Sequence, residues 1–331
     1  MVGQGLAGTN LAWACFFKGV PFKIIDEHAG NDCSALAAGL MNPITGRALV
    51  KSWLFDDLIA AAVPHYKRVE EELSKSLLIQ LPILRVFQSQ KEANDFDLKS
   101  EHPDYQKYIS VAHDLDMRGI RETEYGSGLI KGGYRLDVSA YIETSRAFFL
   151  AKELLEIGVY EERELEQGER LVYCEGHRTN LNEELDIDVM RPVRGELYIL
   201  HCDGVDPLQV IKKGFLAVPW KNPGEFWFGA TYDHHNLVME QTERGVQQLE
   251  KKLEAMFDAP VKVLRNFVGM RPATKDRRPI IGSFKEGEEK YLFNGFGAKG
   301  VSMSPYFASH LLAHLIDGEE LMPDVKLERF F

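Results

Sequence analysis

Three glycines near the start of the chain have a spacing that suits phosphate binding. Gly3, Gly5 and Gly8 form the pattern G-x-G-x-x-G, and Asp26 follows about 20 residues later. Gly3 permits a tight turn, Gly5 lets the backbone approach a pyrophosphate, and Gly8 lets a helix pack closely. Asp26 can accept hydrogen bonds from a ribose. The pattern predicts a dinucleotide site, and the alternative is a glycine-rich turn that binds nothing.

The elements around these glycines favour the dinucleotide site. Residues 6–17 have an apolar face at helical spacing, and residues 22–25 have the pattern of a buried strand. The N-terminus of such a helix presents free N–H groups and a partial positive charge to a pyrophosphate. Only Met1 and Val2 precede the glycines, whereas a strand of about five residues is usual. Either the start of the fold is wrongly assigned here, or the chain is truncated and lacks the central strand of the sheet.

The rest of the chain alternates helical and strand-like patterns, as α/β proteins do. Helices are expected at residues 53–73, 138–157, 241–257 and 304–316. Strands are expected at residues 132–136, 158–163, 170–174, 191–200, 214–218, 225–231, 263–268 and 290–293.

Composition restricts the class of protein. The chain has 331 residues with 39 basic and 50 acidic side chains, which gives a net charge of −11. The length suggests about two domains and suffices for a large core. Disorder and a disulfide scaffold are excluded. The acidic balance argues against extensive contact with nucleic acid or anionic membranes, although it permits a small basic patch.

Cysteine and histidine spacing predicts neither disulfides nor a metal site. The four cysteines form no Cys-x-x-Cys pair, which is typical of reduced thiols in the cytoplasm. His310 and His314 are four residues apart, but their neighbours are apolar and we expect a packed helix. Residues 11–17 form the longest apolar stretch near the start and are too short to span a bilayer. We expect a soluble cytoplasmic protein without a membrane partner.

Several further motifs occur in a fixed order along the chain. They are the loop 34–43, L-V-Y-C-E-G at 171–176, P-V-R-G-E at 192–196, F-G-A-T at 228–231, V-G-M-R-P-A-T-K-D at 268–276, P-I-I-G at 279–282 and G-F-G-A-K-G-V at 295–301. With the glycine pattern and Asp26, they make the chain resemble, from end to end, the flavoprotein amine and amino-acid oxidases. This family includes D-amino-acid oxidase, glycine oxidase and sarcosine oxidase. The closing motifs are also similar to the flavin domain of the bifunctional enzymes that modify the tRNA wobble uridine.

The resemblance implies a fold and a cofactor. The fold class is α/β, with a Rossmann-like FAD-binding domain interleaved with an antiparallel β-sheet substrate domain. Residues 1–50, 132–186 and 262–331 would form the first domain, and residues 51–131 and 187–261 the second. FAD would be bound non-covalently, because residues 297–300 contain no cysteine or histidine for attachment. The residues implied to line FAD are Gly3, Gly5, Gly8, Asp26, Ser34, Gly39, Gly176, Gly282, Gly295, Gly300 and Val301.

The resemblance also implies an activity, in which Arg271 binds a substrate carboxylate. A planar guanidinium suits this task because it forms a bidentate, charge-assisted pair. The alternative role for Arg271 is a structural ion pair, for instance with Asp276. Lys299 and Arg47 are further substrate-binding candidates. The implied reaction oxidises the C–N bond of a primary or secondary amino acid by hydride transfer to flavin N5, and no acid–base pair of the protein is required.

Two other functions stay open. The first is oxidation of carboxymethylaminomethyl-uridine in tRNA, which the basic residues Lys275, Arg277 and Arg278 favour and the net charge of −11 disfavours. For these three residues we expect ion pairing with the acidic surface. The second is a catalytically inactive, truncated scaffold, suggested by the short start. The substrate, its stereochemistry, the electron acceptor and the oligomeric state are not predicted.

Overall fold

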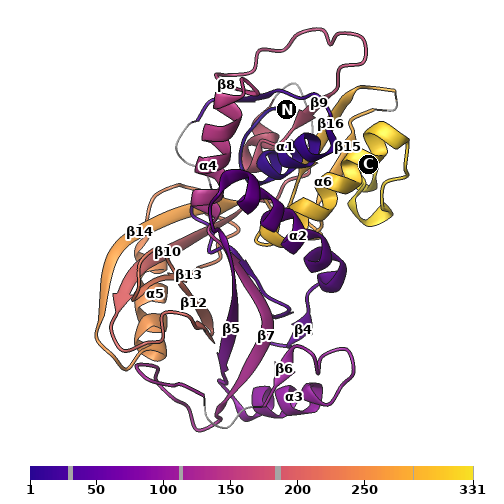
Figure 1. The fold of residues 1–331 in the computed structure, drawn as a ribbon. Helices are drawn as coiled ribbons and strands as arrows, with labels where there is room; N and C mark the ends of the chain where they lie inside the picture. The colour runs from indigo at the N-terminus through magenta and orange to yellow at the C-terminus, as the bar shows by residue number, and fades with distance from the viewer. Residues whose placement is uncertain (29–32, 112–114, 183–187, 286, 331) are drawn as a thin grey trace.

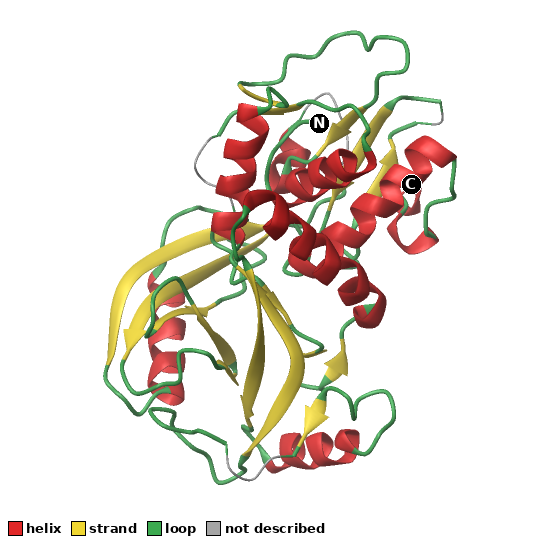
Figure 2. Ribbon diagram, viewed as in Figure 1, coloured by secondary structure: helices red, strands yellow, loops and turns green. Residues whose placement is uncertain are grey.

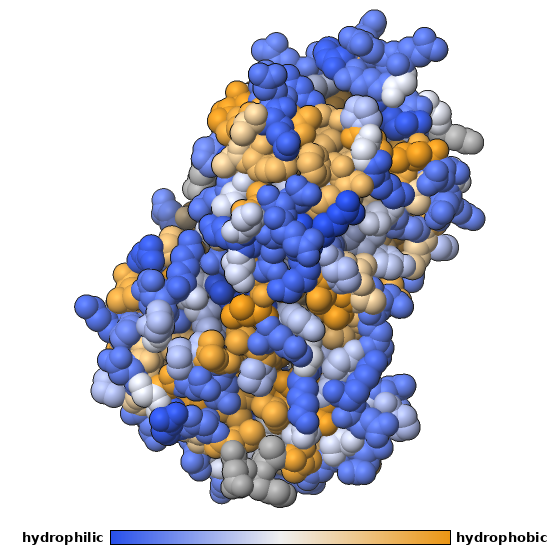
Figure 3. Space-filling view, viewed as in Figure 1, coloured by the Kyte–Doolittle hydropathy of each residue, from blue (hydrophilic) through white to orange (hydrophobic). Residues whose placement is uncertain are grey.

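The chain folds into two lobes, which lie one above the other in Figure 1. The computed structural model describes residues 1–28, 33–111, 115–182, 188–285 and 287–330. The first lobe, in the upper half of the view, contains both ends of the chain, and the second contains a large curled sheet (Figure 2). Hydrophilic residues predominate on the face in Figure 3, with smaller hydrophobic groups over both lobes.

The first lobe is built around short, mostly parallel strands. They are β1 (Ile24–Asp26), β8 (Leu155–Ile157), β9 (Leu171–Tyr173), β15 (Ile280–Ser283) and β16 (Lys290–Asn294). β1 pairs with β8, and β16 pairs with β9 and β15, where only the β15–β16 pair is antiparallel. Val2 joins the two groups through parallel bridges to Ile25 and Tyr173. The start of the chain thus takes the central position of this sheet.

Hydrogen bonds on both sides hold this short central segment. The Val2 N–H donates to the Val172 carbonyl (2.9 Å), and the Ile25 N–H donates to the Met1 carbonyl (2.9 Å). The expectation that the central strand is absent is therefore wrong. Met1 and Val2 occupy its position, and these two residues suffice to connect β1 to β9.

Helices pack on this sheet and on one another. They are α1 (Leu6–Lys18), α2 (Phe55–Leu73), α4 (Val138–Ala151) and α6 (Gly300–Asp317). Asn10 in α1 lies at their centre: its side-chain amide donates to Ser304 Oγ of α6 (2.8 Å) and accepts from the Tyr141 hydroxyl of α4 (2.9 Å). The Tyr66 hydroxyl of α2 donates to the Val301 carbonyl (2.8 Å). Because buried polar groups are costly when unpaired, this network fixes the start of α6 beside α1.

The second lobe is a mixed sheet whose order is β14-β10-β13-β12-β11-β5-β7-β2, with β6 also paired to β7. Its strands are β2 (Leu40–Met41), β5 (Leu78–Val86), β6 (Ile109–Ser110), β7 (Ser127–Leu136), β10 (Val193–Cys202), β11 (Val210–Lys213), β12 (Phe215–Pro219), β13 (Glu225–Gly229) and β14 (Val261–Arg271). The predicted antiparallel sheet needs one correction, because β11 and β5 pair in parallel. A parallel pair is possible here because a long connection, which includes β7 and β10, separates β5 from β11 in the sequence.

Smaller elements complete the chain. They are the strand pair β3 (Ile44–Thr45) and β4 (Val50–Lys51), the helices α3 (Gln90–Ser100) and α5 (Glu243–Met256), and the 3₁₀ helices η1 (Gly176–Leu181), η3 (Pro323–Val325) and η4 (Leu327–Phe330). Leu249 and Met256 of α5 pack on the outer face of the large sheet, against Phe226 and Phe228. The inner face carries a separate apolar cluster that includes Leu197, Ile83 and Val218.

Two local predictions are wrong. The helix predicted at 138–157 ends at Ala151, because Glu153 adopts a left-handed conformation (φ 58°) and the chain turns into β8. The strand predicted at 158–163 does not form: the chain leaves the sheet after Gly158, whose N–H still bonds the Asp26 carbonyl (3.0 Å). β5 was not predicted, since Pro82 interrupts its pattern and the pairing with β7 shifts register between Leu81 and Ile83.

The division into two interleaved domains stays a proposal. One segment argues for a different boundary: α2, within residues 51–131, contributes Ala62, Tyr66 and Val69 to the apolar cluster of α1 and α4.

Candidate functional site

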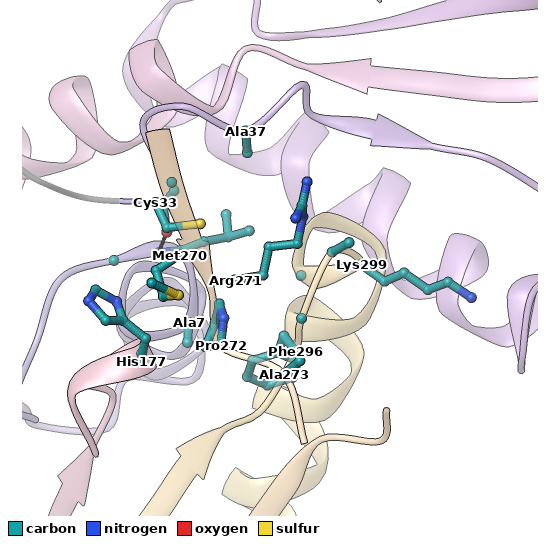
Figure 4. Close-up of a pocket in the computed structure, with 18 of the residues that line it drawn as sticks. Ala7, Cys33, Ala37, His177, Met270, Arg271, Pro272, Ala273, Phe296 and Lys299 are labelled. Carbon is teal, nitrogen blue, oxygen red and sulfur yellow. Dashed lines mark hydrogen bonds between the residues drawn. The ribbon is translucent and has the colours of Figure 1, made fainter. Parts of the chain in front are cut away.

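A cavity of about 1310 Å³ extends from the glycine turn of the first lobe to the inner face of the large sheet. The first lobe contributes the start of α1, the end of β1, the start of η1 and the loop before α6. The second contributes β2 and parts of β10, β11, β12, β13 and β14. Figure 4 shows Ala7, Ala37, Arg271 and Phe296, from four separate segments, around one space. The cavity exceeds the 300–1,000 Å³ usual for a drug-sized ligand, so it has room for a large one.

The glycine turn has the geometry that its spacing predicts. Gly3 has φ +96°, a conformation that favours glycine. A β-carbon on Gly8 would lie 2.0 Å from the Gly3 carbonyl oxygen, so α1 packs against the turn more closely than any other residue allows. Both predictions are confirmed, whereas the approach of a pyrophosphate to Gly5 stays a prediction.

The N-terminus of α1 is open to the cavity. Its N-cap, Gly5, provides no side-chain cap, and the first turn contains no acidic residue. The Leu6 N–H donates to Ser34 Oγ (3.1 Å), which places the loop after β1 beside the helix start. Gly5, Leu6 and Ala7 all line the cavity. Free N–H groups at a helix N-terminus bind phosphate, so this end of the cavity suits a pyrophosphate.

Asp26 lies next to the glycine turn and is hydrogen-bonded to it. Its Oδ2 accepts from the Gln4 N–H (2.7 Å), and its Oδ1 accepts from the His28 N–H (3.0 Å) and from Arg146 Nη2 (2.7 Å). Burial by itself would raise the pKa of Asp26, but the Gln4 N–H and Arg146 outweigh it and the pKa is lowered. Asp26 is therefore an ionised acceptor at the cavity wall, and its bond to a ribose stays a prediction.

An ion pair between Arg178 and Glu27 forms part of the cavity wall in the first lobe. Gly176, with φ +61°, begins η1 beside it and lines the cavity.

Two segments from distant parts of the chain face each other where the lobes meet. Gly39 (φ +74°) lies so close to β7 that a β-carbon there would be 1.9 Å from the Leu136 carbonyl oxygen. Opposite it, the loop before α6 is held by a bond from the Gly297 N–H to the Pro272 carbonyl (2.9 Å). Gly300 and Val301 line the cavity beside this loop. Both walls combine backbone and small side chains with apolar ones such as Leu40 and Phe296, which suits a flat ring system.

Comparison with known proteins agrees with this geometry. The sequence model of the family described as DAO, FAD dependent oxidoreductase, matches residues 1–315. The chain belongs to this family. FAD is the family's cofactor, and the open helix N-terminus, the glycine turn and the long cavity fit it. When bound, FAD supplies the redox chemistry, and this chain's residues bind it and position the substrate.

Individual relatives are distant. The bifunctional protein MnmC of tRNA 5-methylaminomethyl-2-thiouridine biosynthesis from Maricaulis maris is 24% identical over 96% of this chain and 52% of its own length. The chain thus spans about half the length of such curated relatives. Iminodiacetate oxidase from Chelativorans sp. BNC1 has a TM-score of 0.77 at 21% identity, covering 99% of this chain and 97% of that one. Glycine oxidase from Geobacillus kaustophilus has a TM-score of 0.78 at 18% identity, covering 97% and 94%. These structures share the fold of this FAD-dependent oxidoreductase.

Arg271 lies where the cavity enters the second lobe. Its Nη1 donates to the Thr231 carbonyl (3.3 Å) and is 3.5 Å from the Arg194 carbonyl, and its guanidinium lies 4.2 Å from the centre of the Tyr232 ring. In Figure 4 the side chain extends toward the segment that carries Ala37. Asp276 pairs with Arg329 instead, so the alternative Arg271–Asp276 ion pair does not form.

The other predicted residues divide into two groups. Gly3, Gly5, Asp26, Ser34, Gly39, Gly176, Lys299, Gly300 and Val301 line the cavity with Arg271. Gly8, Arg47, Gly282 and Gly295 do not line it. Gly295 serves packing, since a β-carbon there would lie 2.7 Å from Thr274 Cγ2. Lys299 lines the cavity, but its side chain points away from Arg271 (Figure 4), and burial together with Arg278 and Arg277 lowers its pKa.

The basic cluster does not behave as predicted. Among the residues that the structure describes, Lys275, Arg277 and Arg278 form no ion pair, so the expected pairing with acidic residues is wrong. Arg278 instead lies 4.0 Å from the centre of the Trp53 ring. Arg277 and Arg278 line the cavity mouth and leave positive charge there.

His310 and His314 make structural contacts near the end of the chain. His310 Nε2 accepts from the Met322 N–H (2.9 Å), and His314 Nδ1 lies 2.8 Å from the Glu319 carbonyl. Within the described part of the chain, no three metal-ligating side chains come together. No described helix combines the length and apolarity that crossing a membrane requires. Sequence reasoning missed Lys212 and Arg146, whose positions depend on strand pairing and helix packing.

Proposed function

We propose that this FAD-dependent oxidoreductase oxidises the C–N bond of a primary or secondary amino acid, with the substrate carboxylate bound by Arg271. One observation carries the proposal. Arg271 lines the cavity, and no carboxylate among the described residues pairs with it. Its described partners are two carbonyl oxygens and the Tyr232 ring, so its bidentate carboxylate-binding capacity is unused.

The surrounding residues position the substrate and exclude water. Leu197, Leu216 and Trp227 line the cavity beyond Arg271. An apolar wall strengthens the Arg271–carboxylate pair because fewer water molecules compete for it. A carboxylate held in this way places the adjacent carbon and amine next to the cofactor end of the cavity. We also propose that FAD is held non-covalently, and that the protein works in the cytoplasm, where its cysteines would stay reduced.

A matched pair of substrates tests the role of Arg271. For Arg271→Lys and Arg271→Ala, KM for an amino acid should rise about 10- to 100-fold, and KM for the corresponding amine without a carboxylate should change little. Equal effects on both compounds would contradict a carboxylate-binding Arg271.

A second candidate function is oxidation of a carboxymethylaminomethyl-uridine in tRNA. Arg277 and Arg278, which line the cavity, and the neighbouring Lys275 form no ion pair with a described residue, and their charges favour this function. The match to MnmC proteins also extends over most of this chain. The net charge of −11 disfavours it. Binding of bulk tRNA at low salt that weakens for an Arg277→Gln/Arg278→Gln variant would support this function, and the absence of binding would remove it.

A further inference from the structure

The inner face of the large sheet carries an unexpected charge at its far end. Apolar side chains, which include Leu197, Val210 and Leu216, line much of this face. Lys212 of β11 lies among them, half-buried, and lines the same cavity as Arg271. A charged amine on an apolar wall is unfavourable unless a partner compensates it.

Strand register fixes the position of Lys212 on this face. Leu197 pairs with Gly229, Gly229 with Leu216, and Leu216 with Lys212, so these residues form one row across β10, β13, β12 and β11. Side chains in such a row project to the same face. The next strand continues the row, because Lys212 pairs with Arg85 of β5.

Lys212 and Arg85 together have more positive charge and more donors than their described partners use. Lys212 Nζ donates to the Gly214 carbonyl (2.9 Å), which leaves two of its three N–H groups available. Arg85 pairs with Glu92, its Nη2 donates to the Gly46 carbonyl (3.0 Å), and its buried Nη1 has no hydrogen-bond partner. One carboxylate therefore faces two cations.

The local field disfavours the charged form of Lys212 in the absence of a ligand. Burial, with Arg85 next to it, lowers the pKa of Lys212 to about 8. Glu92 acts in the opposite direction, and Lys252, which approaches Gly214 from the outer face, adds to the lowering. An anion bound at this end would compensate the positive charge.

The distance between the Arg271 guanidinium and the Lys212 amine determines how long a ligand must be to contact both. The Arg271 guanidinium lies against Gly195 of β10, and Lys212 is three strands away on β11. Three strand spacings correspond to about 14 Å between backbones, and the two long side chains shorten the gap between their charged ends. A ligand that contacts both ends is an extended molecule with an anionic group at each end.

From this geometry we propose that the substrate carries a second anionic group, a carboxylate or a phosphate, which Lys212 binds at the far end of the cavity while Arg271 holds the carboxylate beside the reacting carbon. Lys212 is then a specificity-determining residue, and Arg85, which does not line the cavity, acts on it through the local potential. This inference rests on the proposed oxidation of an amino acid, which it narrows to long dianionic amino acids.

A length series with neutral partners tests the inference. The substrates are N-substituted glycines from N-(carboxymethyl)glycine to N-(5-carboxypentyl)glycine, each paired with the carboxamide in place of the distal carboxylate. For the wild-type holoenzyme, kcat/KM should rise with length, and the longest carboxylate should exceed its carboxamide about 10- to 100-fold. A phosphonate of the same length distinguishes the two anions. Equal kcat/KM for carboxylate and carboxamide at every length would overturn the inference.

The variant Lys212→Met should remove this preference, because it should slow the substrates with a distal carboxylate more than it slows their carboxamides. Lys213→Met is the matched control, because Lys213 is the next residue of β11 but its Nζ donates to the Arg121 carbonyl on the outer face. It should retain the preference. A Lys212→Met enzyme that still prefers the anionic substrate would also overturn the inference.

An equilibrium measurement separates this inference from the proposed function. Azelate (nonanedioate), which has the same number of atoms between its carboxylates as N-(5-carboxypentyl)glycine, and its monoamide are not oxidised, and their dissociation constants are measured by calorimetry. Azelate should bind about 10-fold more tightly than the monoamide to the wild type and equally to Lys212→Met. If no amine reduces the flavin but this difference is found, the proposed oxidation fails and the distal anion site stands. If amines reduce the flavin and azelate binds no better than its monoamide, the site fails and the oxidation stands.

Discussion

Gly195 leaves the space that the guanidinium of Arg271 fills. A β-carbon on Gly195 would lie 2.6 Å from both Nη1 and Nη2 of Arg271. The two residues are on the adjacent strands β10 and β14, where Val193 pairs with Arg271 and Gly195 with Gly269. The glycine in P-V-R-G-E and the arginine in G-M-R-P-A thus form one structural unit, although 76 positions separate them in the sequence.

Gly195→Ala should therefore displace Arg271 without unfolding the protein, because the end of a flexible side chain can move away. We expect about a 10-fold rise in KM for an amino acid, with a thermal midpoint close to that of the wild type. In an Arg271→Ala background, Gly195→Ala should add little to KM, and steady-state kinetics of the double-mutant cycle measure this coupling. Additive effects would show that Gly195 acts independently of Arg271.

Two glycines of the N-terminal turn should differ when replaced by alanine. Gly8→Ala forces a β-carbon against the Gly3 carbonyl, so the FAD-free protein should lose about 2–3 kcal/mol of unfolding free energy in urea. In Gly5→Ala the nearest atom, Ser34 Oγ, is 3.4 Å away and the stability should be nearly unchanged. The dissociation constant of FAD should instead rise about 10-fold or more, because the new methyl group meets the pyrophosphate. Equal losses of stability in the two variants would contradict this distinction.

The Asp26–Arg146 ion pair predicts how stability depends on pH. The pKa of Asp26 is lowered in the folded protein, so its stabilisation is present above the unfolded pKa of about 4 and is lost as pH falls. At pH 6, Asp26→Asn should be about 3 kcal/mol less stable than the wild type, because Arg146 loses its partner inside the protein. The difference should shrink below about pH 4 in urea unfolding of the FAD-free proteins. If the difference in unfolding free energy between the two proteins stays constant from pH 6 to pH 3, the ion pair does not make stability depend on pH.

Local patterns in the sequence predicted the parts of this structure that are set by local physics. The helix at 6–17 and the strand at 22–25 are confirmed with small shifts, as α1 and β1, because glycine and apolar periodicity determine them directly. The role of Val2 was not predictable, since its bridges to Ile25 and Tyr173 depend on segments far away in the sequence. The same holds for Asn10, a polar residue in an apolar helix whose partners come from α4 and α6.

For the site, the order of the motifs predicted that Arg271 and Gly39 line the cavity. Nothing in the motifs indicated that Gly282 and Arg47 lie outside it. Lys212 was not predicted because β11, which carries it, lies between the predicted strands 191–200 and 214–218. Its place on the inner face follows only from the register of β12 with β11.

The anaerobic absorbance of the flavin tests the central claim most directly. Purified protein loaded with FAD and mixed without oxygen with a panel of primary and secondary amino acids should lose its absorbance near about 450 nm with at least one of them. The Arg271→Ala protein, loaded equally with FAD, should keep that absorbance at the same substrate concentration. A wild-type flavin that no amino acid in the panel reduces would contradict the claim that this enzyme oxidises an amino-acid C–N bond.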